Sequence, residues 1–200
     1  MGYDPIGMGD MGQNPPAQPT YRDELLNMLK AYSFKRGDFT LASGKKSEFF
    51  LDCKRTLLRS RGHYLVAELI MEILHTFHGV DAVAGVELGG CPLASAVAMA
   101  SATSGMQDEY NALYIRKTAK DHGTKNLIEG GARGDRKVVL LEDVITTGGS
   151  SMVALQALKD AAYVPVAVIV VVDRLEGGSD AIHEKFGIPV ISLFTIKDFL

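Results

Sequence analysis

The stretch from Val138 to Ser151 reads Val-Val-Leu-Leu-Glu-Asp-Val-Ile-Thr-Thr-Gly-Gly-Ser-Ser. Its four leading apolar residues predict a buried β-strand, with Glu142 and Asp143 at the end of that strand. The loop that follows, 146–151, contains only small and hydroxyl-bearing residues, and an apolar helical pattern resumes at Met152. A strand, such a loop and a helix N-terminus can cradle a phosphate through backbone N–H groups, and the carboxylates can accept hydrogen bonds from sugar hydroxyls. The stretch therefore predicts a site for a phosphorylated sugar.

A plainer interpretation of this stretch is an ordinary strand-to-helix turn with Ser150 or Ser151 as the helix N-cap. That interpretation leaves two acidic residues at the mouth of an apolar strand unexplained. Two familiar phosphate motifs are excluded. No lysine lies between Asp143 and Leu158, as a Walker loop requires, and neither this loop nor 85–90 contains the Gly-x-Gly-x-x-Gly fingerprint of dinucleotide-binding folds.

Predicted strands and helices alternate from residue 65 onward. Short unbroken apolar runs predict strands over 82–86, 112–115, 138–141, 166–172 and 190–193. Helical patterns cover 21–34, 65–77, 92–101 and 152–162, and a hairpin is expected at 39–52. Unbroken apolar strands are typical of a parallel sheet covered by helices on both faces, so we expect an α/β fold. In such sheets ligands bind beyond the carboxyl ends of the strands, where 87–90, the segment from Arg116 and 142–151 should meet.

Composition limits the classes of function. The chain has 200 residues, of which 46% are hydrophobic and 22% charged, as in an ordinary globular domain. A net charge of −3 argues against a broad nucleic-acid or membrane surface, and no apolar run approaches the length of a bilayer span. The two cysteines, Cys53 and Cys91, have no metal-type spacing and fit reduced thiols in the cytoplasm. We expect residues 1–19, rich in Gly, Pro and Met, to be disordered and residues 20–200 to form a single domain.

A second segment rich in charged residues precedes Lys137. About twenty residues without apolar periodicity begin Arg116-Lys117-Thr-Ala-Lys120-Asp121-His122-Gly. A solvated loop is the plain interpretation of a charged run. However, four potential cations within seven residues, next to a predicted phosphate site, favour a lid that binds a diphosphate.

Four segments give the sequence a resemblance to the orotate phosphoribosyltransferases: Phe39–Phe50, Lys117–Gly123, Glu142–Ser151 and Asp173–Gly177. The resemblance covers the chain from about residue 20 to its end. It implies a type I phosphoribosyltransferase-like fold, which is a central parallel sheet flanked by helices with a small N-terminal hood region. It also implies a cytoplasmic enzyme of pyrimidine biosynthesis. That enzyme transfers the 5-phosphoribosyl group from phosphoribosyl pyrophosphate to orotate, giving orotidine 5′-phosphate and pyrophosphate.

The resemblance implies roles for individual residues. Catalytic roles fall to Lys120, Asp121, His122, Glu142 and Asp143, with Glu142 and Asp143 accepting hydrogen bonds from the ribose hydroxyls. Phosphoribosyl pyrophosphate would be bound by Arg116, Lys117, Lys120, His122, Glu142, Asp143, Val144, Ile145, Thr146, Thr147, Gly148, Gly149 and Ser150. Orotate would be bound by Phe49, Phe50, Thr146 and Arg174. Mg²⁺ would be held mainly by substrate and water, without a dedicated set of protein ligands.

Alternatives stay open for several of these residues. Phe49 and Phe50 are adjacent on a predicted strand, so one of them is expected to pack in the core. Arg174 can instead form a surface salt bridge with Asp173 or Glu176. In the family the cationic loop closes over the neighbouring subunit, which implies a homodimer with shared active sites. No nucleic-acid or membrane partner is expected, in line with the net charge of −3.

The chain departs from the family pattern at two positions. Many members carry lysine where this sequence has Ala42 and Gly89. The missing contacts would be absent or supplied by Lys45, Lys46 or the backbone at 89–90. Two other functions are considered: transfer to a purine or to uracil, and a phosphoribosyl-pyrophosphate-sensing regulator. The net charge and the lack of a helix-turn-helix candidate argue against a regulator of this kind.

Overall fold

A six-stranded sheet forms the centre of the protein in a computed structural model that describes residues 19–40, 46–105, 109–117, 127–131 and 136–200. The strand order is β5-β4-β3-β6-β7-β8. Neighbouring strands are parallel except for β4 and β5, which are antiparallel. The bounds are β3 (Val80–Val86), β4 (Asn111–Ile115), β5 (Ile128–Glu129), β6 (Lys137–Ile145), β7 (Val164–Asp173) and β8 (Val190–Thr195). The prediction for residues 1–19 lies outside the described residues except at Pro19.

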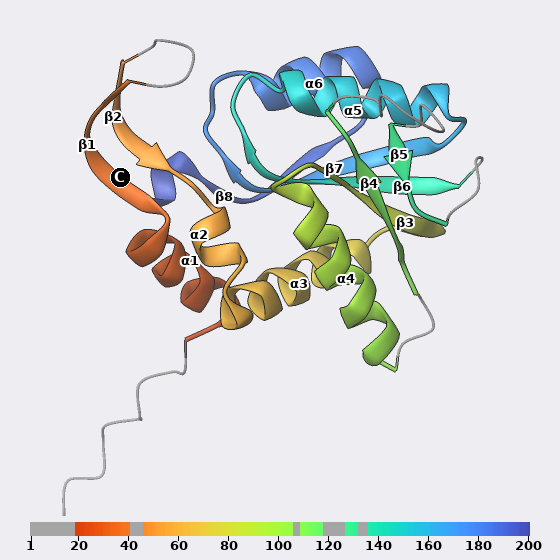
Figure 1. The fold of residues 1–200 in the computed structure, drawn as a ribbon, viewed down its shortest axis with the longest axis horizontal. Helices are drawn as coiled ribbons and strands as arrows, with labels where there is room; N and C mark the ends of the chain where they lie inside the picture. Colours follow the sequence, from red (N-terminus) through yellow and green to blue (C-terminus); the bar gives the residue numbers. More distant parts are fainter. Residues whose placement is uncertain (1–18, 41–45, 106–108, 118–126, 132–135) are drawn as a thin grey trace, which may run out of the picture.

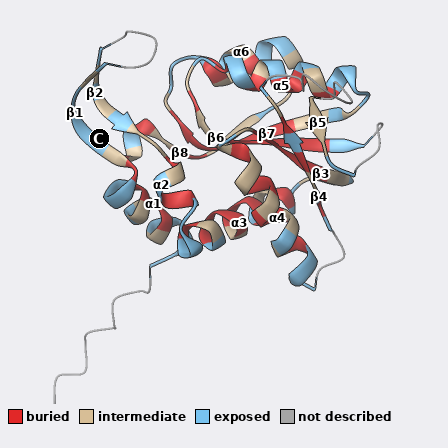
Figure 2. Cartoon of the chain, in the orientation of Figure 1, coloured by how far each residue is buried: buried red, intermediate tan, exposed pale blue. Residues whose placement is uncertain are grey.

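Helices cover both faces of this sheet (Figure 1). One face carries α1 (Tyr21–Tyr32), the short α2 (Lys54–Leu57), α3 (Ser60–Leu74) and α4 (Gly90–Thr103). The other face carries α5 (Gly149–Asp160) and α6 (Gly178–Phe186). Alternate residues of each strand pack against the helices on opposite faces of the sheet: Val139 packs with α3 and α4, and Leu140 packs with α5. The central strands β3, β6 and β7 are consequently buried along most of their length (Figure 2).

A separate antiparallel hairpin of β1 (Phe34–Thr40) and β2 (Lys46–Leu51) stands beside α1 at one end of the sheet (Figure 1). This hairpin is the predicted hood region. A 3₁₀ turn, η1 (Ile196–Asp198), ends the chain near it. None of the described helices combines the length and apolarity that crossing a bilayer requires.

The α/β prediction is confirmed, with differences at the element boundaries. The helix expected from residue 65 begins at Ser60, and the hairpin expected from residue 39 begins at Phe34. The difference that bears on the site is in β6, which was expected to end at residue 141 but runs on to Ile145. The ladder continues because Glu142 pairs with Val170 and Val144 with Val172 on β7. The elements α2, α6 and β5 were not predicted, because they are too short for a clear periodic pattern. The two carboxylates therefore project from a strand rather than from a loop.

Close backbone contact joins β3 to the start of α4. A Cβ atom added at Gly85 would lie 2.1 Å from the carbonyl oxygen of Gly90, and one at Gly90 would lie 2.4 Å from that of Leu141 on β6. Only glycine permits this approach. It brings the loop 87–89 against the end of β6, where the carboxylates lie.

Candidate active site

Glu142 is held inside the protein by the first turn of α5. Its side chain is buried, and its Oε1 accepts hydrogen bonds from Ser151 Oγ at 3.0 Å and Ser150 Oγ at 3.3 Å. The N-cap of α5 is Gly148, with φ 76°, so the alternative of Ser150 or Ser151 as N-cap is wrong. The two serines instead tie the loop to the strand, while Thr147 and Gly149 are exposed.

Burial disfavours the ionised forms of both carboxyl groups at the end of β6. Burial raises the pKa of Glu142 to about 7; the hydrogen bond from Ser151 opposes this shift and the charge of Asp143 adds to it. Burial also raises the pKa of Asp143, while the charge of Lys54 and the Val144 N–H, which donates to Oδ1 at 3.0 Å, lower it. Adjacent acidic groups with raised pKa values are typical of functional sites.

Replacing Glu142 with glutamine is expected to flatten the dependence of stability on pH. The carboxyl binds its proton more tightly folded than unfolded, so the wild-type free energy of unfolding falls as pH rises from the unfolded pKa toward about 7. Between about pH 5.5 and about pH 8.5 the ionisation of Glu142 should lower the free energy of unfolding of the wild type by about 2 kcal/mol. In Glu142→Gln this pH-dependent loss should be absent. Urea unfolding at both pH values measures it. Glu184→Gln, an exposed carboxylate on α6, is the control, and an unchanged slope in Glu142→Gln would contradict the burial argument.

A pocket of about 250 Å³ opens beside these carboxylates. Its walls come from five segments: the end of β6, the loop after β3, the start of α2, the residue Lys117 after β4, and the first turn of α5. The lining residues are Lys54, Val86, Glu87, Leu88, Gly89, Lys117, Glu142, Asp143, Val144 and Ser150. Lys117 is anchored here by its backbone N–H, which donates to Glu87 Oε1 at 2.8 Å. The segments 87–90, 116–117 and 142–150 therefore meet, as the strand-end argument predicted.

The loop after β7 supports the loop after β6. The Gly178 N–H donates to the Thr146 carbonyl oxygen at 3.0 Å, and the Arg174 N–H donates to that of Ile145 at 3.0 Å. A Cβ at Gly178 would lie 2.5 Å from the Thr146 oxygen, so this contact requires glycine. The loop 146–151, which we call the hydroxyl loop, is thereby fixed between α5 and the turn that carries Arg174.

A second cavity of about 390 Å³ lies between this turn and the hood hairpin. Arg174 and Phe49 line it together, with the guanidinium carbon 4.8 Å from the ring centroid. Arg174 Nη2 lies 2.9 Å from Glu176 Oε1, so the predicted salt bridge with Glu176 is present, but the side chain is only 10% exposed. Its Nε is buried and has no hydrogen-bond partner among the described residues. An orphaned guanidinium donor beside an aromatic face suits a planar anion.

The two adjacent phenylalanines take different places. Phe49 packs against the core and Phe34, so the core interpretation and the cavity interpretation both hold for it. Phe50 is 36% exposed, and its ring centroid lies 5.6 Å from that of Phe39. Because strand neighbours point to opposite faces, Phe50 is not among the described residues that line the Arg174 cavity.

Several predicted residues have other partners or cannot be located. Arg116 lines a neighbouring pocket with Lys117, Gly149 and Ser150, and its Nε lies 3.1 Å from Glu129 Oε1 on β5. Lys46 lines the Arg174 cavity and donates to Thr40 Oγ1. Lys120, Asp121 and His122, together with Ala42 and Lys45, lie outside the described residues. Lys54 was not predicted from the sequence, because no local pattern connects a residue after β2 with the end of β6.

The described residues contain no group of three or more His, Cys, Asp or Glu side chains arranged to hold a metal ion. The oxygen-rich pocket nevertheless has the ligand chemistry that Mg²⁺ prefers, since carboxylates and substrate phosphates are both hard oxygen donors. The residues present therefore fit a magnesium ion that is carried in with a phosphorylated substrate.

Comparison with known proteins gives a consistent result. The family model of the phosphoribosyl transferase domain matches residues 57–196. An orotate phosphoribosyltransferase of Sorangium cellulosum is 48% identical over 181 residues, covering 90% of this chain and 93% of that protein. One from Thermosynechococcus vestitus is 47% identical over 178 residues, covering 88% and 92%. Among solved structures, Mycobacterium tuberculosis orotate phosphoribosyltransferase with Fe(III) dicitrate has a TM-score of 0.77 at 31% identity, covering 90% of this chain and 99% of that one. The same enzyme with 5-phospho-alpha-D-ribosyl 1-diphosphate has a TM-score of 0.71 at 27% identity, covering 90% and 92%.

Proposed function

This chain belongs to the orotate phosphoribosyltransferases, and on that premise we propose that it transfers the 5-phosphoribosyl group from phosphoribosyl pyrophosphate to orotate. The resemblance seen in the sequence is thereby confirmed at the level of the family. The observation that carries the proposal is the backbone link between two sites. The Arg174 N–H, in the turn that lines the second cavity, donates to the carbonyl oxygen of Ile145, at the end of the strand whose carboxylates line the first pocket.

In the proposed complex the sugar diphosphate lies along the end of β6. The backbone of Thr146–Ser150 and the N-terminus of α5 bind the 5-phosphate, because the N–H groups of a first helical turn have no partner within the helix and Thr147, Gly149 and Ser150 are exposed there. Glu142 and Asp143 accept hydrogen bonds from the ribose hydroxyls. As the C1–O bond breaks, positive charge develops on the sugar, and the neighbouring carboxylates stabilise it.

The departing pyrophosphate is assigned to the cationic segment. Arg116, Lys117, Lys120 and His122 would bind its oxygens, with Asp121 in the same segment. Mg²⁺, held mainly by the substrate and water beside Glu142 and Asp143, would neutralise part of the charge. In this proposal the enzyme is a cytoplasmic homodimer whose subunits share active sites, with residues 20–200 as one catalytic domain. Light scattering of the purified protein tests the dimer.

Orotate is placed in the Arg174 cavity. Its carboxylate or ring oxygens would accept hydrogen bonds from the guanidinium, including the orphaned Nε, and its ring would lie against Phe49. Thr146 would contact the same ligand from the hydroxyl loop. The proximity of this loop to both sites brings the attacking ring nitrogen and the ribose C1 together.

A direct assay tests the function. The protein is mixed with Mg²⁺, phosphoribosyl pyrophosphate and orotate, and the loss of orotate absorbance is followed. Turnover that depends on all four components is expected. Adenine, hypoxanthine and uracil, offered one at a time, test transfer to another base. The absence of turnover with orotate, or faster turnover with one of these bases, would contradict the proposal.

Replacing Arg174 with lysine should raise KM for orotate on the order of tenfold, because the guanidinium fork offers donors that an ammonium group cannot reproduce. KM for phosphoribosyl pyrophosphate should change by less than about twofold, since that ligand lies at β6. Arg59→Lys, at an exposed arginine stacked on Tyr32, is the matched control. Equal changes in both KM values would instead indicate a general distortion.

A further inference from the structure

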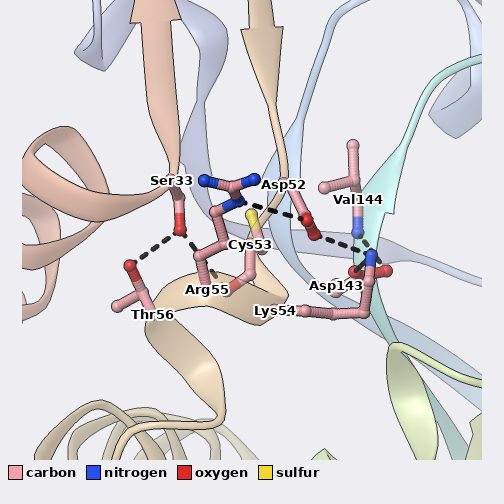
Figure 3. A network of polar contacts seen from close by, with 8 residues as sticks. All are labelled: Ser33, Asp52, Cys53, Lys54, Arg55, Thr56, Asp143 and Val144. Carbon is pink, nitrogen blue, oxygen red and sulfur yellow. Dashed lines mark hydrogen bonds and ion pairs between the residues drawn. The ribbon is translucent and has the colours of Figure 1, made fainter.

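Lys54 lies at the first position of α2, directly after the hood hairpin, and its side chain reaches across to the end of β6 (Figure 3). Its Nζ is 2.7 Å from Asp52 Oδ1 and 3.8 Å from Asp143 Oδ2. An ammonium group has three N–H donors. The Asp52 contact takes one of them, and the Asp143 contact is longer than a hydrogen bond, so donors are left for a ligand.

The pocket around Lys54 has an acidic lining. Glu87, Glu142 and Asp143 contribute carboxylates, and within the described lining the ammonium groups of Lys54 and Lys117 oppose them. A diphosphate brings further negative charge, so its entry here depends on cations that can contact it directly. Lys54 meets this requirement, because its side chain is 44% exposed and faces the pocket.

The opposite wall of the pocket cannot supply such a cation. A Cβ atom at Gly89 would lie 2.3 Å from Asp143 Oδ1 and 2.5 Å from Oδ2, so no side chain fits there while Asp143 keeps its place. The backbone therefore approaches Asp143 from one side and the Lys54 ammonium from the other. Of the two lysines in the described lining, Lys54 is the one that pairs with Asp143, so it provides the ammonium group at this end of the pocket.

We propose that the Lys54 ammonium group binds the diphosphate of phosphoribosyl pyrophosphate. The inference rests on the proposed function, in which Thr146–Ser150 takes the 5-phosphate and leaves the diphosphate as the anionic group beside Asp143. Lys54 bridges the bound diphosphate and Asp143, and so holds that carboxylate toward the ribose. The family lysine that is absent at Gly89 is thus replaced from a different element, not by Lys46, which lines the Arg174 cavity.

Binding measurements without turnover test this role. Calorimetry compares wild type, Lys54→Met and Arg55→Met for two probes, inorganic pyrophosphate with Mg²⁺ and ribose 5-phosphate. Lys54→Met should weaken pyrophosphate binding about tenfold or more and change ribose 5-phosphate binding by less than about twofold. Arg55 is a matched control, because it also pairs with Asp52, at 3.7 Å, but does not line the pocket among the described residues. Arg55→Met should bind both probes as wild type does.

Two results would overturn the proposal. One is unchanged pyrophosphate affinity in Lys54→Met; the other is an equal loss for both probes, which indicates a structural role for Lys54. Lys54→Arg keeps the charge and should retain most of the pyrophosphate affinity, so it also tests the proposal if the methionine variant does not fold. Pyrophosphate binding is measured without orotate, and a failure of the orotate assay is therefore distinguishable from a failure of this inference.

Discussion

Lys120→Ala lowers kcat by about 10²–10³-fold, the loss expected when one charged donor to a developing anion is removed. The sequence places Lys120 in the segment Lys117-Thr-Ala-Lys120-Asp121-His122, which resembles the catalytic loop of the family. Its ammonium group is assigned to the pyrophosphate oxygen that gains charge as the C1–O bond breaks. The effect should appear in kcat more than in KM for orotate, since orotate is assigned to the Arg174 cavity. Steady-state kinetics with each substrate varied in turn measures it.

The control for this experiment is Lys159→Ala. Lys159 lies in the last turn of α5, at the end of the helix away from the hydroxyl loop. Its kcat should stay within about twofold of wild type. Urea unfolding should give both variants a wild-type midpoint, because Lys159 is exposed on α5 and Lys120 is assigned to the substrate. An unchanged kcat in Lys120→Ala would remove Lys120 from the mechanism and transfer its role to Arg116, Lys117 or His122.

The fold was predictable wherever local pattern and burial coincide. The central strands β3, β6 and β7 are apolar because they are buried on both faces, and this pattern was visible without any structure. The meeting of the segments at 87–90, 116–117 and 142–150 followed from the rule on strand ends. The boundary of β6 was not predictable, because Glu142 and Asp143 read as the end of an apolar strand although the ladder to β7 continues past them.

The parts of the site that escaped prediction depend on contacts between distant residues. The separation between Lys54 and Asp143 along the chain conceals a contact of 3.8 Å. The sequence allowed Arg174 to be either a ligand-binding residue or a salt-bridge partner, and only its burial against Phe49 shows that a buried donor is left over. Likewise the sequence showed that Gly89 departs from the family pattern, but only the geometry shows that Asp143 fills the space a side chain would need.

Gly89→Ala is expected to lower kcat/KM for phosphoribosyl pyrophosphate by about 10–100-fold while the protein stays folded. The new methyl group would lie within 2.5 Å of all three atoms of the Asp143 carboxyl group, so that carboxylate must turn away. In turning, it gives up the hydrogen bond from the Val144 N–H and its position beside Lys54. Ribose hydroxyls then lose an acceptor. Steady-state kinetics measures the loss of kcat/KM, and a urea unfolding curve shows whether the stability of the fold has changed as well.

Gly90→Ala provides the contrasting case, because the groups that its methyl would meet cannot turn away. The carbonyl oxygen of Leu141 lies 2.4 Å from that position and the Cα of Gly85 lies 2.9 Å from it, and both are backbone atoms. This variant should lose about 1–3 kcal/mol of stability or more. If Gly89→Ala instead keeps full activity, Asp143 can move without cost and its contact with the ribose contributes little. Gly89→Lys should then also be active, since the three atoms nearest to a Cβ at this position all belong to the Asp143 carboxyl group. Under the present proposal Gly89→Lys is as impaired as Gly89→Ala, because Lys54 already supplies the ammonium group at this end of the pocket.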